Sequence, residues 1–158
     1  NEENKHSRHT DSLLSLLFIL ALSDGADCQN FKEFKRRHIL STTFKTKNEA
    51  DWVKYLLGNE LCGRTKMQSF IKSSEAKIEQ ICNGSGSVSG SYTKSTDVFE
   101  VYLVKSSEGI HPKCIINNCS SGKYNVIVKC ENNLPVHYER QDIEQNTRPQ
   151  PCFQRALF

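Results

Sequence analysis

The chain has 158 residues, which is enough for one domain and leaves little room for a second. Its formal net charge of +3 favours polyanionic partners such as RNA, heparin-like glycans or anionic cell surfaces, without choosing among them. None of the seven cysteines forms a Cys-x-x-Cys pair. This favours disulfide bonds formed in an oxidising compartment over a structural metal site, and we expect no metal or other cofactor.

An apolar run over residues 13–22 follows a polar segment and is too short to span a bilayer as a helix. We interpret residues 1–25 as a secretory signal peptide, cleaved after Ser23 or Gly25, with a buried amphipathic helix as the alternative. Because the chain starts at Asn1 without an initiator methionine, we expect its front to be truncated. Cleavage would remove two of 21 basic and four of 18 acidic residues, so the net charge would rise from +3 to +5. No membrane span is expected after cleavage.

Three helices are predicted in the first half of the chain. Residues 30–40 place two phenylalanines and His38 at helical spacing, on one face. Asn48 is a suitable N-cap for a second helix, and Gly58 is well placed to end it. A third helix is predicted to begin near Ser74.

Strands are predicted after these helices. The polar segment 83–90 is expected to be a flexible loop. Apolar residues then alternate with polar ones over 99–103 and 124–128, which is typical of antiparallel strands. From about residue 140 we expect an irregular tail, held only where Cys152 ties it down. Helices followed by strands indicate an α+β domain.

Two segments carry a family resemblance. The first ends Phe34-Lys-Arg-Arg-His38, and the second runs from Cys130 through Leu-Pro-Val to His137. Both resemble the histidine-bearing segments of the pancreatic-type ribonuclease (ribonuclease A) superfamily, and the likeness spans roughly residues 31–139. It looks closest to amphibian secreted ribonucleases and angiogenins. The resemblance implies that residues 26–158 form a disulfide-stapled α+β domain with three helices on a curved antiparallel sheet.

The cysteines provide a test of the resemblance, since family disulfides are gained or lost in pairs. The matched positions imply the disulfides Cys62–Cys114 and Cys82–Cys130. Another disulfide that is widely shared in the family is missing here, because neither of its two matched positions is a cysteine. A correct alignment requires this joint loss, since the loss of one cysteine alone would leave an unpaired thiol. Three cysteines stay unmatched: Cys28, Cys119 and Cys152. We expect one terminal bridge and one odd thiol, in a monomer or, alternatively, a disulfide-linked dimer.

The resemblance implies an acid/base pair acting on RNA. His38 would be the base and His137 the acid, since histidine exchanges protons readily near neutral pH. The family lysine that follows a cysteine is replaced, because Gly63 stands there and the segment is two residues longer. We take Lys66 as the first candidate for the missing cation and Arg64 as the second.

Four further residues are candidates for binding or orientation. Ser69 takes the place of a family threonine that reads the base, which implies a preference for pyrimidines. Tyr138 would keep an aromatic wall, and Glu139 would keep a carboxylate able to orient the acid. Arg37 is either a solvated helix residue or a contact for RNA phosphates.

Two functional hypotheses remain. The first is a secreted endoribonuclease, with a role in host defence, that cleaves single-stranded RNA 3′ of pyrimidines through a 2′,3′-cyclic phosphate. The alternative is a catalytically weak binding protein on the same scaffold, either angiogenin-like or lectin-like. Asn83 is the better glycosylation candidate because it lies in a predicted loop, and Asn118 is the second.

Overall fold

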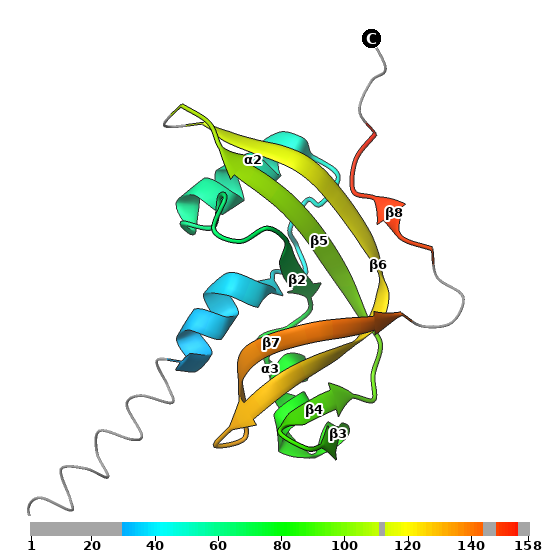
Figure 1. The fold of residues 1–158 in the computed structure, drawn as a ribbon. Coiled ribbons are helices and arrows are strands. Elements are labelled where there is room, and N and C mark those ends of the chain that lie inside the picture. The colour runs from blue at the N-terminus through cyan, green and yellow to red at the C-terminus, as the bar shows by residue number, and fades with distance from the viewer. Residues whose placement is uncertain (1–29, 111–112, 144–147, 155–158) are drawn as a thin grey trace, which may run out of the picture.

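The computed structural model describes residues 30–110, 113–143 and 148–154, which form a curved sheet with helices packed against it (Figure 1). The proposed signal peptide and Cys28 lie outside the described residues. Within the described residues, no helix is long and apolar enough to cross a membrane.

Three helices occur where the sequence predicts them. The N-terminal helix is described over residues 30–38, α2 spans Glu49–Gly58 and α3 spans Glu75–Gln80. The side chain of Asn48 accepts a hydrogen bond from the amide of Ala50 at 3.0 Å, which caps a donor that the helix leaves unpaired. After α3 the backbone continues into a wider turn, η1, over Ile81–Ser85.

Eight strands form one sheet in the described part of the chain. They are β1 (Ile39–Leu40), β2 (Gln68–Lys72), β3 (Gly86–Ser89), β4 (Tyr92–Ser95), β5 (Phe99–Glu108), β6 (Cys114–Glu131), β7 (Leu134–Ile143) and β8 (Gln150–Pro151). The order is β1-β2-β5-β6-β4-β3, and β7 and β8 both pair with β6. The sheet is mixed because β1 runs parallel to β2, while the other pairs are antiparallel.

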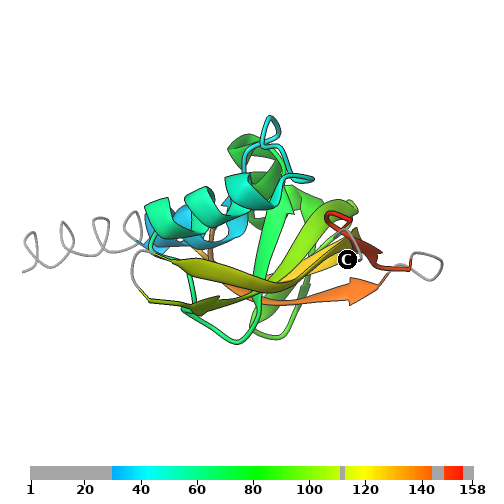
Figure 2. The same cartoon turned by 90° about the horizontal axis from the view of Figure 1, so that it is seen from above.

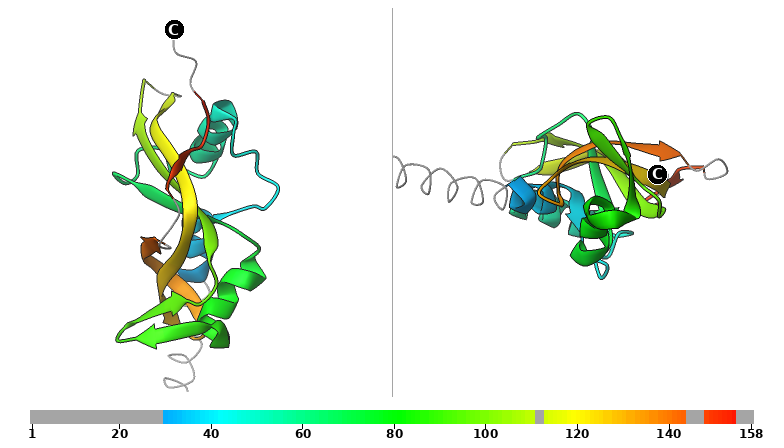
Figure 3. Two further views of the ribbon diagram at one scale, coloured as in Figure 1. Left: turned by 90° about the vertical axis from the view of Figure 1, so that its right-hand side faces the viewer. Right: turned by 90° about the horizontal axis from the view of Figure 1, so that it is seen from below.

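Two segments that the sequence predicts to be irregular are partly strands in the structure. Residues 86–89 form β3, which pairs with β4 across a turn where Gly90 has a φ of +61°. Glycine adopts this left-handed conformation without steric cost, so the turn allows a hairpin despite its polar composition. The tail is also partly ordered, because β7 continues to Ile143 and β8 pairs with β6 (Figure 3).

Two hydrophobic clusters hold the helices on the sheet. The first surrounds Trp52 of α2 and Phe70 of β2, and both side chains are fully buried. The second joins Phe34 of the N-terminal helix to Ile71 of β2 and Val126 of β6. Successive β2 side chains therefore enter different clusters, as strand alternation requires. Figure 2 shows the curve of the sheet from above, with α2 lying along one side of it.

Three disulfides are present among the described residues: Cys62–Cys114, Cys82–Cys130 and Cys119–Cys152. The first two are those implied by the family resemblance. The third ties the tail to the middle of β6. The Cys62–Cys114 bond closes a sequence separation of 52 residues. In the chain-entropy account, a loop of this size is worth about 4 kcal/mol of stability.

Candidate active site

His38 lies at the end of the N-terminal helix, between two aromatic rings. Its ring centroid is 5.3 Å from that of Phe34 and 5.1 Å from that of Tyr138, and the Tyr138 ring is stacked on it at 19°. Its Nδ1 lies 2.9 Å from the backbone oxygen of Ser69 on β2. A carbonyl oxygen can only accept, so Nδ1 carries the proton. In the neutral ring, Nε2 is then the free proton acceptor.

The surroundings of His38 favour its neutral form. Burial lowers the pKa of His38 from 6.5 to about 4, because desolvation penalises the imidazolium ion. The hydrogen bond to Ser69 opposes this shift, while the positive charges of Arg64, His137 and Arg37 reinforce it. At neutral pH the ring is therefore unprotonated and able to act as a base.

His137 lies on β7, close enough for its charge to act on His38. Its side chain is 59% exposed, and its Nε2 lies 3.3 Å from Oε2 of Glu139. The structure thus brings the two predicted histidines together. It also gives the second one a carboxylate partner, which can orient the ring.

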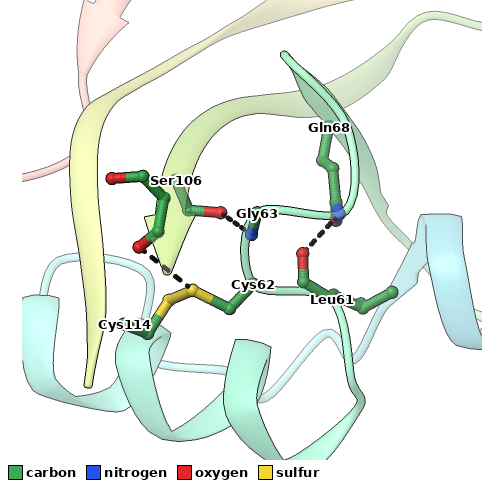
Figure 4. The surroundings of a disulfide bond; sticks show 7 residues. Leu61, Cys62, Gly63, Gln68, Ser106 and Cys114 are labelled. Atoms are coloured by element: carbon green, nitrogen blue, oxygen red, sulfur yellow. Dashed lines mark hydrogen bonds between the residues drawn. A yellow bond between two sulfur atoms is a disulfide. The ribbon is translucent and has the colours of Figure 1, made fainter. Parts of the chain in front are cut away.

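The loop after α2 is held at three points (Figure 4). The backbone oxygen of Leu61 accepts from the amide of Arg64 at 3.2 Å and from Nε2 of Gln68 at 2.7 Å. The amide of Gly63 donates to the Ser106 hydroxyl at 3.1 Å, and the preceding residue, Cys62, is disulfide-bonded. Gly63 has a φ of +65°, which a side chain would strain. The glycine after the cysteine thus makes the turn that leads to Arg64.

Arg64 and Lys66 have different neighbours. Arg64 acts electrostatically on His38, and its own pKa is lowered by burial and by the charges of Arg37 and Arg36. Lys66 instead lines a groove with Gly63, Thr65, Lys105, Ser106, Ser107, Glu108 and Asn117. Of the two candidate cations, Arg64 thus acts on the charge of His38, and Lys66 lines the groove beside Ser106.

Arg37 and Arg36 have different roles at the end of the N-terminal helix. Arg36 pairs with Glu33 at 2.8 Å and donates to the backbone oxygen of Asn59, which ties the helix to the end of α2. Arg37 pairs with the same carboxylate at 3.0 Å, yet its side chain stays 40% exposed. Its buried Nε has no hydrogen-bond partner. Arg37 is therefore a partly neutralised cation beside His38.

Two glutamines contribute to the site without having been predicted from the sequence. Gln68 is 2% exposed and holds the loop through Leu61, while its Oε1 has no hydrogen-bond partner. Gln141 accepts a 2.7 Å hydrogen bond from the Tyr138 hydroxyl, and the ring of Tyr138 stacks on that of His38. Neither glutamine stands out by composition or spacing, because each contact depends on how the backbone turns: at the loop for Gln68, and at the register shift within β7 for Gln141.

Three curated proteins are similar to this chain: two are named ribonucleases and one is named an angiogenin. The chain is 31% identical over 137 residues to an angiogenin from Saguinus oedipus, a match covering 80% of this chain and 92% of that protein. It is 30% identical over 127 residues to an oocytes ribonuclease from Aquarana catesbeiana, covering 80% and 90%. A pancreatic ribonuclease from Iguana iguana is 24% identical over 115 residues, covering 70% and 97%. A scan against protein-family models finds no match.

Solved structures have the same fold. The zebrafish RNase5 structure aligns with a TM-score of 0.61 at 18% identity, covering 73% of this chain and 96% of that one. RNASE ZF-3E aligns with a TM-score of 0.62 at 20% identity, covering 73% and 98%. Together with the sequence relatives, these matches show that the chain belongs to the pancreatic-type ribonuclease (ribonuclease A) family.

Proposed function

We propose that the protein is an endoribonuclease that cleaves single-stranded RNA 3′ of pyrimidines through a 2′,3′-cyclic phosphate. The geometry of His38 is the observation that supports this most directly. Its Nδ1 is committed to the Ser69 carbonyl, its Nε2 is free, and its pKa is about 4. A neutral base beside a second, exposed histidine is what transphosphorylation requires.

In the first step, Nε2 of His38 takes the proton of the ribose 2′-hydroxyl as the oxygen attacks phosphorus. Protonated His137 gives its proton to the departing 5′-oxygen, so the P–O5′ bond breaks and the cyclic phosphate forms. In the second step the roles reverse. His137 takes a proton from water as it opens the ring, and His38 returns its proton to the 2′-oxygen.

Arg64 is our proposed cation for the negative charge that develops on the phosphate oxygens. Its electrostatic contact with His38 and the firm anchoring of its turn support this role over Lys66. A positioned cation in a partly desolvated site lowers the barrier because it needs no rearrangement during the reaction. A planar guanidinium can also hold two phosphate oxygens at once.

The other predicted residues have supporting roles in this proposal. Ser69 reads the base, and the Tyr138 ring forms a wall while keeping the His38 ring in place. Glu139 orients His137. Arg37 binds a neighbouring phosphate of the RNA, which its exposed part can reach.

We also propose that the protein is secreted and acts as a monomer in host defence. The three disulfides support an oxidising compartment. Asn83 is exposed at the η1 turn, which supports glycosylation there. Basic surface residues such as Lys105 would favour anionic cell-surface glycans. Mass spectrometry of the secreted protein, with and without glycosidase treatment, tests the glycan assignment.

Cleavage of a pyrimidine–adenosine dinucleotide tests the proposed chemistry. We expect His137→Ala to lose most of the activity, and Arg64→Ala to lose about 10²-fold or more in kcat, as when a charge-stabilising donor is removed. The matched Lys66→Ala variant should change kcat far less. Equal inactivity of the wild type and His137→Ala would instead support a binding protein, and a greater loss in Lys66→Ala would reassign the cation.

A further inference from the structure

Gln68 is a buried polar side chain at the start of β2 that the proposed reaction does not use. It is 2% exposed, and the other large side chains that are fully buried are hydrophobic. A buried amide costs free energy unless hydrogen bonds replace those it made with water. Within the described residues, Nε2 of Gln68 donates to the backbone oxygen of Leu61 at 2.7 Å, and Oε1 has no partner. Hydrophobic packing therefore does not account for a glutamine at this position.

The hydrogen bond from Gln68 closes the loop that carries both candidate cations. Leu61 precedes the loop and Gln68 follows it, so the contact joins the two ends of residues 62–67 (Figure 4). The same Leu61 oxygen accepts from the amide of Arg64 at 3.2 Å. The disulfide at the first residue of the loop and the amide of the glycine after it anchor the loop before Arg64. Gln68 anchors it on the other side.

The residue after Gln68 holds the proposed base. The Ser69 backbone oxygen accepts from Nδ1 of His38 at 2.9 Å. Pairing with Val104 and Leu103 of β5 fixes the positions of both β2 residues in the sheet. The loop and the base are therefore attached to two consecutive residues of one strand, and the loop is attached through the Gln68 side chain.

We propose that Gln68 is a positioning residue, which fixes the loop of residues 62–67, and with it Arg64, relative to His38. This role rests on the proposed function, in which Arg64 is the cation and His38 the base. Gln68 is too buried to touch the substrate, so it acts through the loop. Without its amide donor the loop would shift while the disulfide still holds its start. A displacement of about 1 Å is enough to lower the rate of an enzymatic reaction about 10²-fold.

Steady-state kinetics of Gln68→Met on a pyrimidine–adenosine dinucleotide test this role. Methionine has nearly the length and volume of glutamine but no hydrogen-bond donor, so the core stays filled. We expect kcat to fall about tenfold or more and KM to change little, because the loss is in stabilisation of the transition state. Asn48→Ala, which removes a helix cap outside the site, is the control for lowered stability and should keep kcat. An unchanged kcat in Gln68→Met would overturn the proposal.

Double-mutant cycles separate the positioning of Arg64 from a general structural role. In the Arg64→Ala background, Gln68→Met should cause no further loss of kcat, because no cation is left to misplace. In the matched Lys66→Ala background, the full loss should remain. Additive losses with Arg64→Ala, or a loss that disappears with Lys66→Ala instead, would contradict the assignment.

Hydrogen exchange of the loop amides tests the anchoring independently of activity. The amides of Gly63 and Arg64 donate to the Ser106 hydroxyl and to the Leu61 oxygen. In Gln68→Met the loop should open more often, so both amides should exchange about tenfold faster, the effect expected for one hydrogen bond. Faster exchange in a protein that cleaves no RNA would support the anchoring and refute only the ribonuclease activity. Equal exchange rates would overturn the positioning role even if RNA is cleaved.

Discussion

The ionisation of His38 leads to a quantitative prediction for activity as a function of pH. Its pKa falls from 6.5 to about 4, a difference worth about 3 kcal/mol at 1.36 kcal/mol per unit. The acidic limb of kcat/KM reports the base of the free enzyme. We therefore expect this limb to have its midpoint near pH 4 rather than near pH 6.5, so that activity persists well into the acid range.

Two independent assays measure the pKa of His38. The first is kcat/KM for a pyrimidine dinucleotide as the pH is lowered. The second is a proton NMR titration of the ring of His38, assigned by the signal that is lost in His38→Ala. Tyr138→Ala exposes the ring, so its pKa should rise back toward 6.5. A midpoint near 6.5 in the wild type would refute the reasoning from burial.

The same ionisation affects stability. The folded pKa lies below the unfolded value of 6.5, so between about pH 6.5 and 4 the unfolded chain binds more protons. The contribution of neutral His38 to the free energy of unfolding is complete above pH 6.5. It is lost as the pH falls toward 4, and the total loss is about 3 kcal/mol. Urea unfolding of the wild type and His38→Gln should show a stability difference that narrows across this window. A parallel pH dependence in both proteins would contradict the prediction.

Three further predictions concern the framework of the site. Gly63→Ala should lower stability by about 1–2 kcal/mol, because φ is +65° and the added methyl would lie 3.1 Å from a neighbouring side chain. Gly58→Ala, with no atom within 4 Å, is the control, and equal urea midpoints would argue against the strain. Asn48→Ala should cost about 1 kcal/mol through the lost cap, whereas Asn48→Asp should not. Replacing Cys119 and Cys152 together by alanine should cost about 3–4 kcal/mol by thermal unfolding, and no change would mean that the tail does not constrain the unfolded chain.

Local sequence signals predict α2 and α3 well, because each has a cap and apolar positions within a few residues. Asn48 and Ser74 both cap the helices expected of them. The hairpin at residues 86–89 is not predicted because its serines and glycines have little preference for strands. It forms through pairing with β4 and through the turn at Gly90, and only the second is visible in the sequence.

Some residues of the candidate site can likewise be predicted from the sequence, and others cannot. His38 and His137 stand in segments that resemble the family, so the amino-acid sequence alone is enough to single them out. The choice between Arg64 and Lys66 could not be made, since it depends on how the longer loop turns at Gly63 and where the Ser106 hydroxyl holds it. Long-range contacts of this kind leave no periodic signal in the sequence. Likewise, cysteine spacing alone does not choose a pairing pattern.

The most direct test of the proposed function is phosphorus NMR of a short single-stranded RNA incubated with the protein. The wild type should produce a 2′,3′-cyclic phosphate 3′ of a pyrimidine, followed by its slow hydrolysis. His38→Ala and His137→Ala should each leave the RNA intact. Products without a cyclic intermediate, or equal cleavage by the wild type and both variants, would contradict the assignment of the two histidines as base and acid.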